Sequence, residues 1–119
     1  MSEITLFGIP SCDSCRKARK WLDEHGISYK FHDFDVDGAP SPEIIRTWCQ
    51  ALGTETVLNR RSTTFRSLSD AERSLENSEA IAHLIHRHPR LLKRPLLQSP
   101  KGYAAGFNAE SYSGILNHG

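Results

Sequence analysis

This chain of 119 residues lacks the features that mark several classes of protein. Its three cysteines are too few for the disulfide framework that holds many small secreted domains together. No hydrophobic run approaches the ~18 apolar residues that a membrane-spanning helix needs. Fifteen basic and fourteen acidic residues nearly cancel, so no excess charge points to nucleic acid or a membrane surface as a partner. The length and composition are those of one globular domain with its own core.

The N-terminal sequence MSEITLFG also lacks the basic segment and the long apolar segment of a secretory signal peptide. We therefore expect a cytoplasmic protein whose cysteines stay reduced. The small size and the near-neutral charge favour a monomer, and we expect it to bind neither membranes nor nucleic acid directly.

The most informative motif is the pair Cys12 and Cys15, which follows an apolar strand pattern at 4–8 and a turn at 9–11. Residues 12–25 have the period and composition of a helix. The two thiols therefore lie about one helical turn apart. The first thiol lies at the helix N-terminus, where unpaired N–H groups and the helix dipole stabilise a thiolate and lower the pKa of Cys12. The motif predicts a site for thiol chemistry.

The sequence leaves two other interpretations of these cysteines. A zinc site needs four ligands, and the third cysteine, Cys49, lies on the apolar side of a predicted helix, where a small buried side chain is expected. His83, His86 and His88 are close in sequence but do not share one helical face. We therefore expect no bound metal. The remaining alternative is a pair of ordinary reduced cysteines on a helix.

Periodicity and turn signals predict the order of the elements. These are a strand at 4–8, a helix at 12–25, a strand at 28–34, a helix at 43–52 capped by Ser41, a helix from 70 that opens with a capping box of Ser69 and Glu72, a helix at 78–88, strands at 95–98 and 103–107, and a helix at 109–117 capped by Asn108. The segment 59–65 is predicted to be irregular. A β-α-β unit normally has parallel strands, and the short turn at 99–102 predicts an antiparallel hairpin. A C-x-x-C motif at the start of the first helix is typical of thioredoxin-like proteins.

Four separated segments carry a family resemblance: GIPSCDSCRKARKWLDEHGI, LNRRSTTFRSL, HPRLLKRPLL and the closing GF-x-x-x-x-Y. In this order they resemble the arsenate reductase/Spx (ArsC-like) family along the whole chain, especially its YffB-like branch of small Gram-negative arsenate or thiol reductases. The resemblance implies an α/β, thioredoxin-like (glutaredoxin-like) mixed sheet in a single domain, 1–119. Thioredoxin-like parts at about 1–38 and 92–119 would flank a helical insertion at about 40–90.

The resemblance also implies roles for individual residues. Cys12 matches the nucleophilic cysteine of the family. Arg94 matches an anion-binding arginine, and Pro95 after it matches a cis-proline beside the nucleophile. A second anion-binding arginine matches Arg61, with Arg60 as the neighbouring candidate.

The chain departs from the arsenate reductases of this family at two positions. Phe107 stands where they have a third arginine, and two arginines leave part of the charge of a tetrahedral dianion uncompensated. Those enzymes also lack a cysteine at the position of Cys15, whereas the C-x-x-C arrangement is that of the Spx regulators, which bind RNA polymerase. Cys15 is therefore a candidate resolving thiol, and Ser11 in the preceding turn is a candidate structural residue of the site.

We therefore expect a thiol oxidoreductase in which Cys12 attacks a disulfide sulfur or an arsenic centre. Cys15, or glutathione from solution, would resolve the adduct. No bound cofactor is expected. Glutathione is the expected co-substrate, glutaredoxin a candidate partner, and a small oxyanion or a disulfide the substrate. Two alternatives stay open: a redox-sensing regulator of the Spx kind that binds RNA polymerase, and a thiol protein without turnover.

Overall fold

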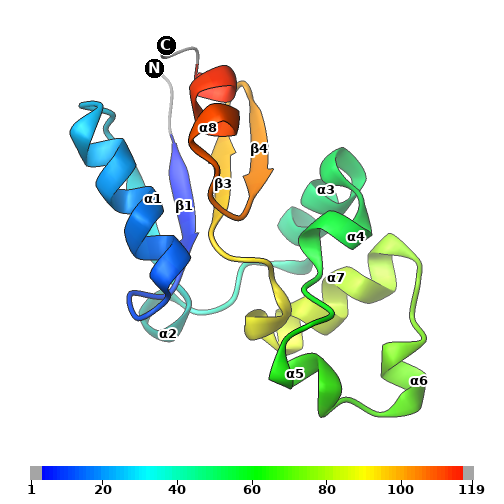
Figure 1. The fold of residues 1–119 in the computed structure, drawn as a ribbon. Helices are drawn as coiled ribbons and strands as arrows, with labels where there is room; N and C mark the ends of the chain where they lie inside the picture. The colour runs from blue at the N-terminus through cyan, green and yellow to red at the C-terminus, as the bar shows by residue number, and fades with distance from the viewer. Residues whose placement is uncertain (1–3, 117–119) are drawn as a thin grey trace. The chain divides into compact units, whose positions relative to one another are not determined.

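The computed structural model describes residues 4–116, and the chain divides into two compact units. The first unit consists of Met1–Gly38 and Arg94–Gly119, and the second of Ala39–Lys93. The first unit carries the sheet, and the second is helical (Figure 1). Within the described residues, no helix combines the length and the apolar character that crossing a lipid bilayer requires.

A mixed sheet of four strands forms the centre of the first unit. Its strands are β1 (Thr5–Gly8), β2 (Lys30–Asp33), β3 (Leu96–Ser99) and β4 (Gly102–Ala105), in the spatial order β2-β1-β3-β4. The pair β1–β2 is parallel, whereas β1–β3 and β3–β4 are antiparallel. The predicted β-α-β unit and the predicted antiparallel hairpin are therefore confirmed.

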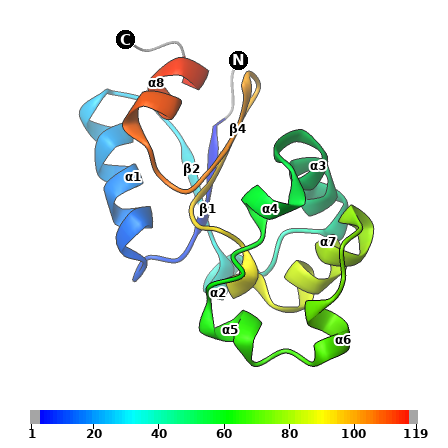
Figure 2. The ribbon, with the colours of Figure 1, turned by 45° about the vertical axis from the view of Figure 1, so that its right-hand side comes forward.

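Two helices cover one face of this sheet, α1 (Asp13–Glu24) and α8 (Ala109–Leu116), as Figures 1 and 2 show. The buried side chains of α1 recur at the spacing of one helical stripe and pack on the strands. The shared core contains Leu6, Ala18, Leu22, Leu97, Ala104 and Tyr112. Leu6 lies opposite Leu97 in the ladder, and Leu97 lies opposite Ala104, so the three strands present these side chains to the same helices.

Helix α8 begins where the sequence predicts. The side chain of Asn108 accepts a hydrogen bond from the backbone N–H of Ser111 at 2.9 Å, which satisfies a donor of the first turn. The buried hydroxyl of Tyr112 donates to the carbonyl of Gly106 at 3.2 Å and ties the helix to the end of β4. The predicted helix end at Asn117 lies outside the described residues.

The second unit is built around two helices that pack on each other, α3 (Pro42–Leu52) and α7 (Ser78–Arg87). Shorter helices join them: α4 (Thr54–Val57), α5 (Thr63–Arg66), α6 (Asp70–Arg73) and the 3₁₀ helix η1 (Pro89–Leu91). The predicted cap of α3 is present, since the Ser41 hydroxyl accepts from the N–H of Ile44 at 3.3 Å. The predicted capping box of α6, between Ser69 and Glu72, is present too.

The short helices are where the sequence prediction was wrong. The strand predicted at 28–34 spans only Lys30–Asp33 in the structure. Phe34, the last residue of the predicted strand, instead begins helix α2 (Phe34–Asp37). The Asp33 carboxylate caps this helix by accepting from the N–H of Asp35 at 2.8 Å. Likewise, α5 lies partly within the segment predicted to be irregular, and its cap is Ser62, whose hydroxyl accepts from the N–H of Phe65 at 3.1 Å. One helical turn is too short to show a hydrophobic period, so only these caps signalled it.

Candidate active site

Cys12 occupies the cap position at the N-terminus of α1. Its N–H donates to the carbonyl of Ile9 at 3.2 Å, and its carbonyl accepts from the N–H of Arg16 at 3.0 Å. The guanidinium of Arg16 also donates to the carbonyl of Ser11 at 3.2 Å. These bonds close a tight turn between β1 and α1, and the turn holds the Cys12 thiol against the unpaired N–H groups of the helix.

The sheet register brings Arg94 to this turn. Phe7 near the end of β1 lies opposite Leu96 at the start of β3, so the residues just before Leu96 lie beside the turn that follows β1. Pro95 is buried, and the peptide bond between Arg94 and Pro95 is cis, as the family resemblance implies. The Arg94 side chain is hydrogen-bonded to Cys12. Two segments far apart in sequence thus form one site.

The surroundings of Cys12 favour its thiolate. Partial burial raises the pKa of Cys12, but the N–H and thiol of Cys15 and the guanidinium of Arg94 outweigh burial, so the pKa lies below its ordinary value. The residue keeps partial access to solvent, which a nucleophile needs. Of the two thiols, Cys12 is therefore the one whose surroundings favour the thiolate and leave it open to solvent.

Cys15 differs from Cys12 in each of these respects. Its side chain is fully buried, and burial raises the pKa of Cys15 to about 12. A hydrogen bond from the N–H of Ile9 lowers this pKa, but by less than burial raises it. The negative charge that develops on Cys12 raises it further. Cys15 therefore stays protonated at neutral pH, and its S–H can donate toward the Cys12 thiolate.

The two other arginine candidates lie in the second unit. Arg60 forms a forked pair with the Glu55 carboxylate, with Nε and Nη2 at 3.1 and 2.9 Å, so its charge is largely committed. Arg61 is exposed, and its backbone N–H donates to Asn59 at 3.1 Å. Together with Leu58 and Lys93 these residues line a cavity of about 420 Å³. The structure thus brings Cys12, Cys15, Arg94 and Pro95 together within one unit and assigns Arg60 and Arg61 to the other.

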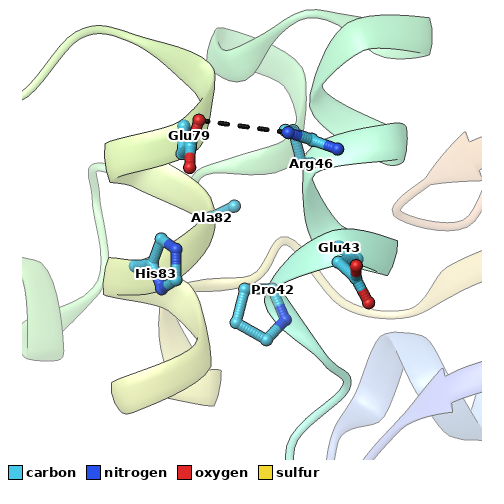
Figure 3. A pocket seen from close by; sticks show the side chains of 6 residues that line it. All are labelled: Pro42, Glu43, Arg46, Glu79, Ala82 and His83. Atoms are coloured by element: carbon cyan, nitrogen blue, oxygen red, sulfur yellow. Dashed lines mark ion pairs between the residues drawn. The ribbon is translucent and has the colours of Figure 1, made fainter.

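The remaining cysteine and the histidines do not extend the site. Cys49 is buried on α3, and burial raises its pKa to about 11. His83 lines a cavity of about 210 Å³ beside α3 and α7, below an ion pair between Arg46 and Glu79 at 3.9 Å (Figure 3). Nδ1 of His86 lies 2.8 Å from the carbonyl oxygen of Pro40. In the part of the chain that the structure describes, no three His, Cys, Asp or Glu side chains are arranged to hold a metal ion.

Comparison with known proteins identifies the family. The model of the ArsC family matches residues 7–115. The chain belongs to this family. Among solved structures, a protein named YFFB has a TM-score of 0.89 and 39% identity, over 95% of this chain and 98% of that one. An ArsC-related protein from Brucella melitensis has a TM-score of 0.68 and 35% identity, over 96% and 94% of the two chains.

This ArsC-family chain is also similar in sequence to a transcriptional regulator. The global transcriptional regulator Spx of Streptococcus mutans is 35% identical over 114 residues, which cover 95% of this chain and 82% of that protein. The resemblance to the arsenate reductase/Spx family that the motifs predict is therefore confirmed.

The predicted fold class is confirmed as well. A glutaredoxin from Archaeoglobus fulgidus has a TM-score of 0.50 at 13% identity, a likeness of fold alone. Together with the mixed sheet and the strong match to YFFB, it shows that this ArsC-family chain has a thioredoxin-like α/β fold. Its cysteine motif thus lies on the fold of a family of thiol reductases.

Phe107 shows what replaces the third arginine in this ArsC-family chain. Its ring packs edge-on against Tyr112, with ring centroids 5.1 Å apart at 86°. The position therefore adds apolar packing on the core of the first unit and supplies no positive charge.

Sequence reasoning missed two residues that shape the dithiol. Ile9 supplies the N–H near Cys15, and Gly8 lies directly against the Cys15 sulfur. The sequence does contain a pattern that indicates the contact between Gly8 and Cys15. Residues 6 and 8 share one face of a strand, and positions 15, 18 and 22 form one stripe of the following helix.

Proposed function

We propose that this chain is a glutathione-dependent thiol oxidoreductase with Cys12 as its nucleophile. The observation that carries the proposal is the Cys12 thiol at the N-terminus of α1, hydrogen-bonded to Arg94 and with a lowered pKa. A lowered pKa increases the fraction of thiolate, and a thiolate reachable from solvent is the species that attacks a disulfide. Glutathione is the abundant thiol of reducing compartments. Because the proposed reaction consumes glutathione, we also propose that the protein is cytoplasmic.

The reaction proceeds by two thiol–disulfide exchanges. The Cys12 thiolate attacks one sulfur of the substrate disulfide, a mixed disulfide forms, and the other sulfur leaves as a thiolate that takes a proton from water. Cys15 then loses its proton and attacks the Cys12 sulfur, which forms the Cys12–Cys15 disulfide and releases the second substrate thiol. Two glutathione molecules reduce this disulfide and become glutathione disulfide. Because Cys15 is buried and resists ionisation, glutathione can also attack the mixed disulfide directly.

A disulfide suits this site better than arsenate. An arsenate dianion needs compensation by several guanidinium groups, and Phe107 offers none at the third position. Arg60 is already paired with Glu55, and within the first unit the anion-binding arginine that the family resemblance implies is Arg94 alone. A glutathione mixed disulfide needs less positive charge around its reacting atom, because the sulfur that is attacked carries no charge.

The test is consumption of NADPH in the presence of glutathione, glutathione reductase and glutaredoxin, with arsenate or a glutathione mixed disulfide as substrate. We expect turnover of the mixed disulfide, its loss in Cys12→Ser, and accumulation of a glutathione adduct in Cys15→Ser, detected by mass spectrometry. Cys49→Ala is the control, since this buried thiol lies on α3 and should leave turnover unchanged. Full activity of Cys12→Ser would end the proposal, and turnover of arsenate would show that fewer than three arginines suffice.

The similarity to Spx, together with the C-x-x-C motif, supports a second candidate, a redox-gated partner of RNA polymerase. In that case the pair Cys12 and Cys15 would act as a switch between thiol and disulfide states. The C-terminal domain of the polymerase alpha subunit should then retain the protein in one redox state and release it in the other. Absence of retention in both states would remove this candidate.

A further inference from the structure

Strand β1 and helix α1 come close together at Gly8 and Cys15, directly beneath the dithiol. Leu6 and Gly8 lie on the same face of β1, because alternate residues of a strand share a face. The buried stripe of α1, which contains Cys15, Ala18 and Leu22, packs against that face. The first residue of the stripe therefore lies over the last residue of the strand.

At this contact, the sulfur of Cys15 fills the space that a side chain on residue 8 would need. A Cβ atom added to Gly8 would overlap Cys15 Sγ, with Cys15 Cβ at 3.6 Å and the ring of Phe31 at 3.8 Å. Cys15 is fully buried, so its sulfur has no solvent-filled space beside it into which it could turn freely. The backbone after Gly8 completes the seat of this sulfur, since the N–H of Ile9 points at it.

A glycine inside a strand weakens the strand unless another group must approach the backbone closely. Here the approaching group is the second thiol of the proposed redox pair. We propose that Gly8 is a positioning residue of the dithiol site: by lacking a side chain, it creates the seat in which Cys15 Sγ lies within hydrogen-bonding reach of Cys12. The inference rests on the proposed function and adds to it the residue that sets the geometry of the pair.

The chemical role of the seat follows from what Cys15 does to Cys12. The S–H of Cys15 donates toward the developing thiolate of Cys12 and stabilises it. A methyl group on residue 8 displaces the Cys15 sulfur, which weakens this donation and carries the second thiol away from the line along which it attacks Cys12. Cys12 then becomes less acidic, and closure of the Cys12–Cys15 disulfide becomes slower.

The experiment compares Gly8→Ala with the unmodified protein. The thiolate of Cys12 is followed by ultraviolet absorbance across pH, and closure of the disulfide is followed after addition of oxidised glutathione. We expect the pKa of Cys12 to rise by about one unit, equal to a tenfold change in its ionisation constant, and disulfide closure to slow. Gly114→Ala is the matched control, because a Cβ there meets nothing within 4 Å and should change neither quantity.

A second comparison separates positioning of the sulfur from a general packing defect. Cys15→Ala removes the sulfur and reopens the space, so the double variant Gly8→Ala/Cys15→Ala should fold even if Gly8→Ala alone does not. In the Cys15→Ala background, the change at Gly8 should no longer shift the Cys12 pKa or the midpoint of urea unfolding. The proposal is overturned if Gly8→Ala leaves the Cys12 pKa unchanged. It is also overturned if its effects persist in the Cys15→Ala background, or if the double variant remains unfolded.

These readouts do not depend on turnover. If the unmodified protein reduces no disulfide substrate, the proposed function fails, while the pKa comparison between Gly8→Ala and Gly114→Ala still decides the role of Gly8. Conversely, normal turnover with an unshifted Cys12 pKa in Gly8→Ala refutes the positioning role alone.

Discussion

Replacing Arg94 by methionine tests the electrostatic account of Cys12 directly. Methionine keeps much of the apolar length of the side chain and removes both its charge and its N–H donors. Because a hydrogen bond and a charge interaction from Arg94 both lower the pKa of Cys12, this pKa should rise in Arg94→Met. The interactions with Cys15 remain, so the pKa should not return fully to that of a free thiol.

The size of the change follows from the position of Cys12. An opposite charge within ~4–6 Å shifts a pKa by about 1–3 units, and partial access to water places Cys12 at the lower end, about one unit or ~1.4 kcal/mol. Below the pKa, the thiolate fraction then falls about tenfold, while the more basic thiolate is about threefold more nucleophilic. The net rate of alkylation should therefore fall about threefold at low pH and rise about threefold at high pH.

The assay is alkylation by iodoacetamide across pH, with the modified cysteine identified by mass spectrometry. Below about pH 9 the signal belongs to Cys12, since the pKa of Cys15 is about 12 and that of Cys49 about 11. Lys101→Met is the matched control, because it removes a positive charge from the β3–β4 turn, at the other end of the sheet. The reasoning is refuted if the rate profiles of Arg94→Met and the unmodified protein coincide, or if Lys101→Met shifts the profile equally.

Two further predictions concern buried groups. Because the folded pKa of Cys49 is raised to about 11, the stability it contributes is complete below its unfolded pKa near ~8.5 and is lost as pH rises toward the folded value, by ~1.4 kcal/mol per pH unit. Cys49→Ala should flatten this decline in urea unfolding between about pH 9 and 10.5, and an unchanged slope would contradict the assignment. Tyr112→Phe should lower the free energy of unfolding by about 1 kcal/mol, since it removes the bond to Gly106; an unchanged urea midpoint would show that this bond adds no stability.

Local chemistry made much of the fold predictable from the sequence. The stripe of Ala18 and Leu22 indicates helix α1, and polar caps such as Ser41 and Asn108 mark helix starts that the structure bears out. Such caps act within three residues, so a single sequence displays them. The position of Cys12 at a helix N-terminus depends on the same local signals, and this is why the sequence could place this thiol there.

The short helices could not be predicted in this way. Helix α2 is one turn, and α5 is one turn, so neither shows a hydrophobic period. A single turn is not stable in isolation, because nucleation costs more than its few hydrogen bonds return. Their stability comes from caps at Asp33 and Ser62 and from the surrounding structure.

By itself, the sequence determined the longer elements, the family and the place of Cys12 at a helix N-terminus, because local patterns and motifs in the chain carry these. Only the tertiary structure showed how Arg94 and Gly8 come to lie beside the two thiols. Arg94 reaches Cys12 because burial of Leu6 and Leu97 on one face fixes the register of β1 and β3. Gly8 lies under Cys15 for the same kind of reason, since a helix stripe and a strand face meet only when they pack.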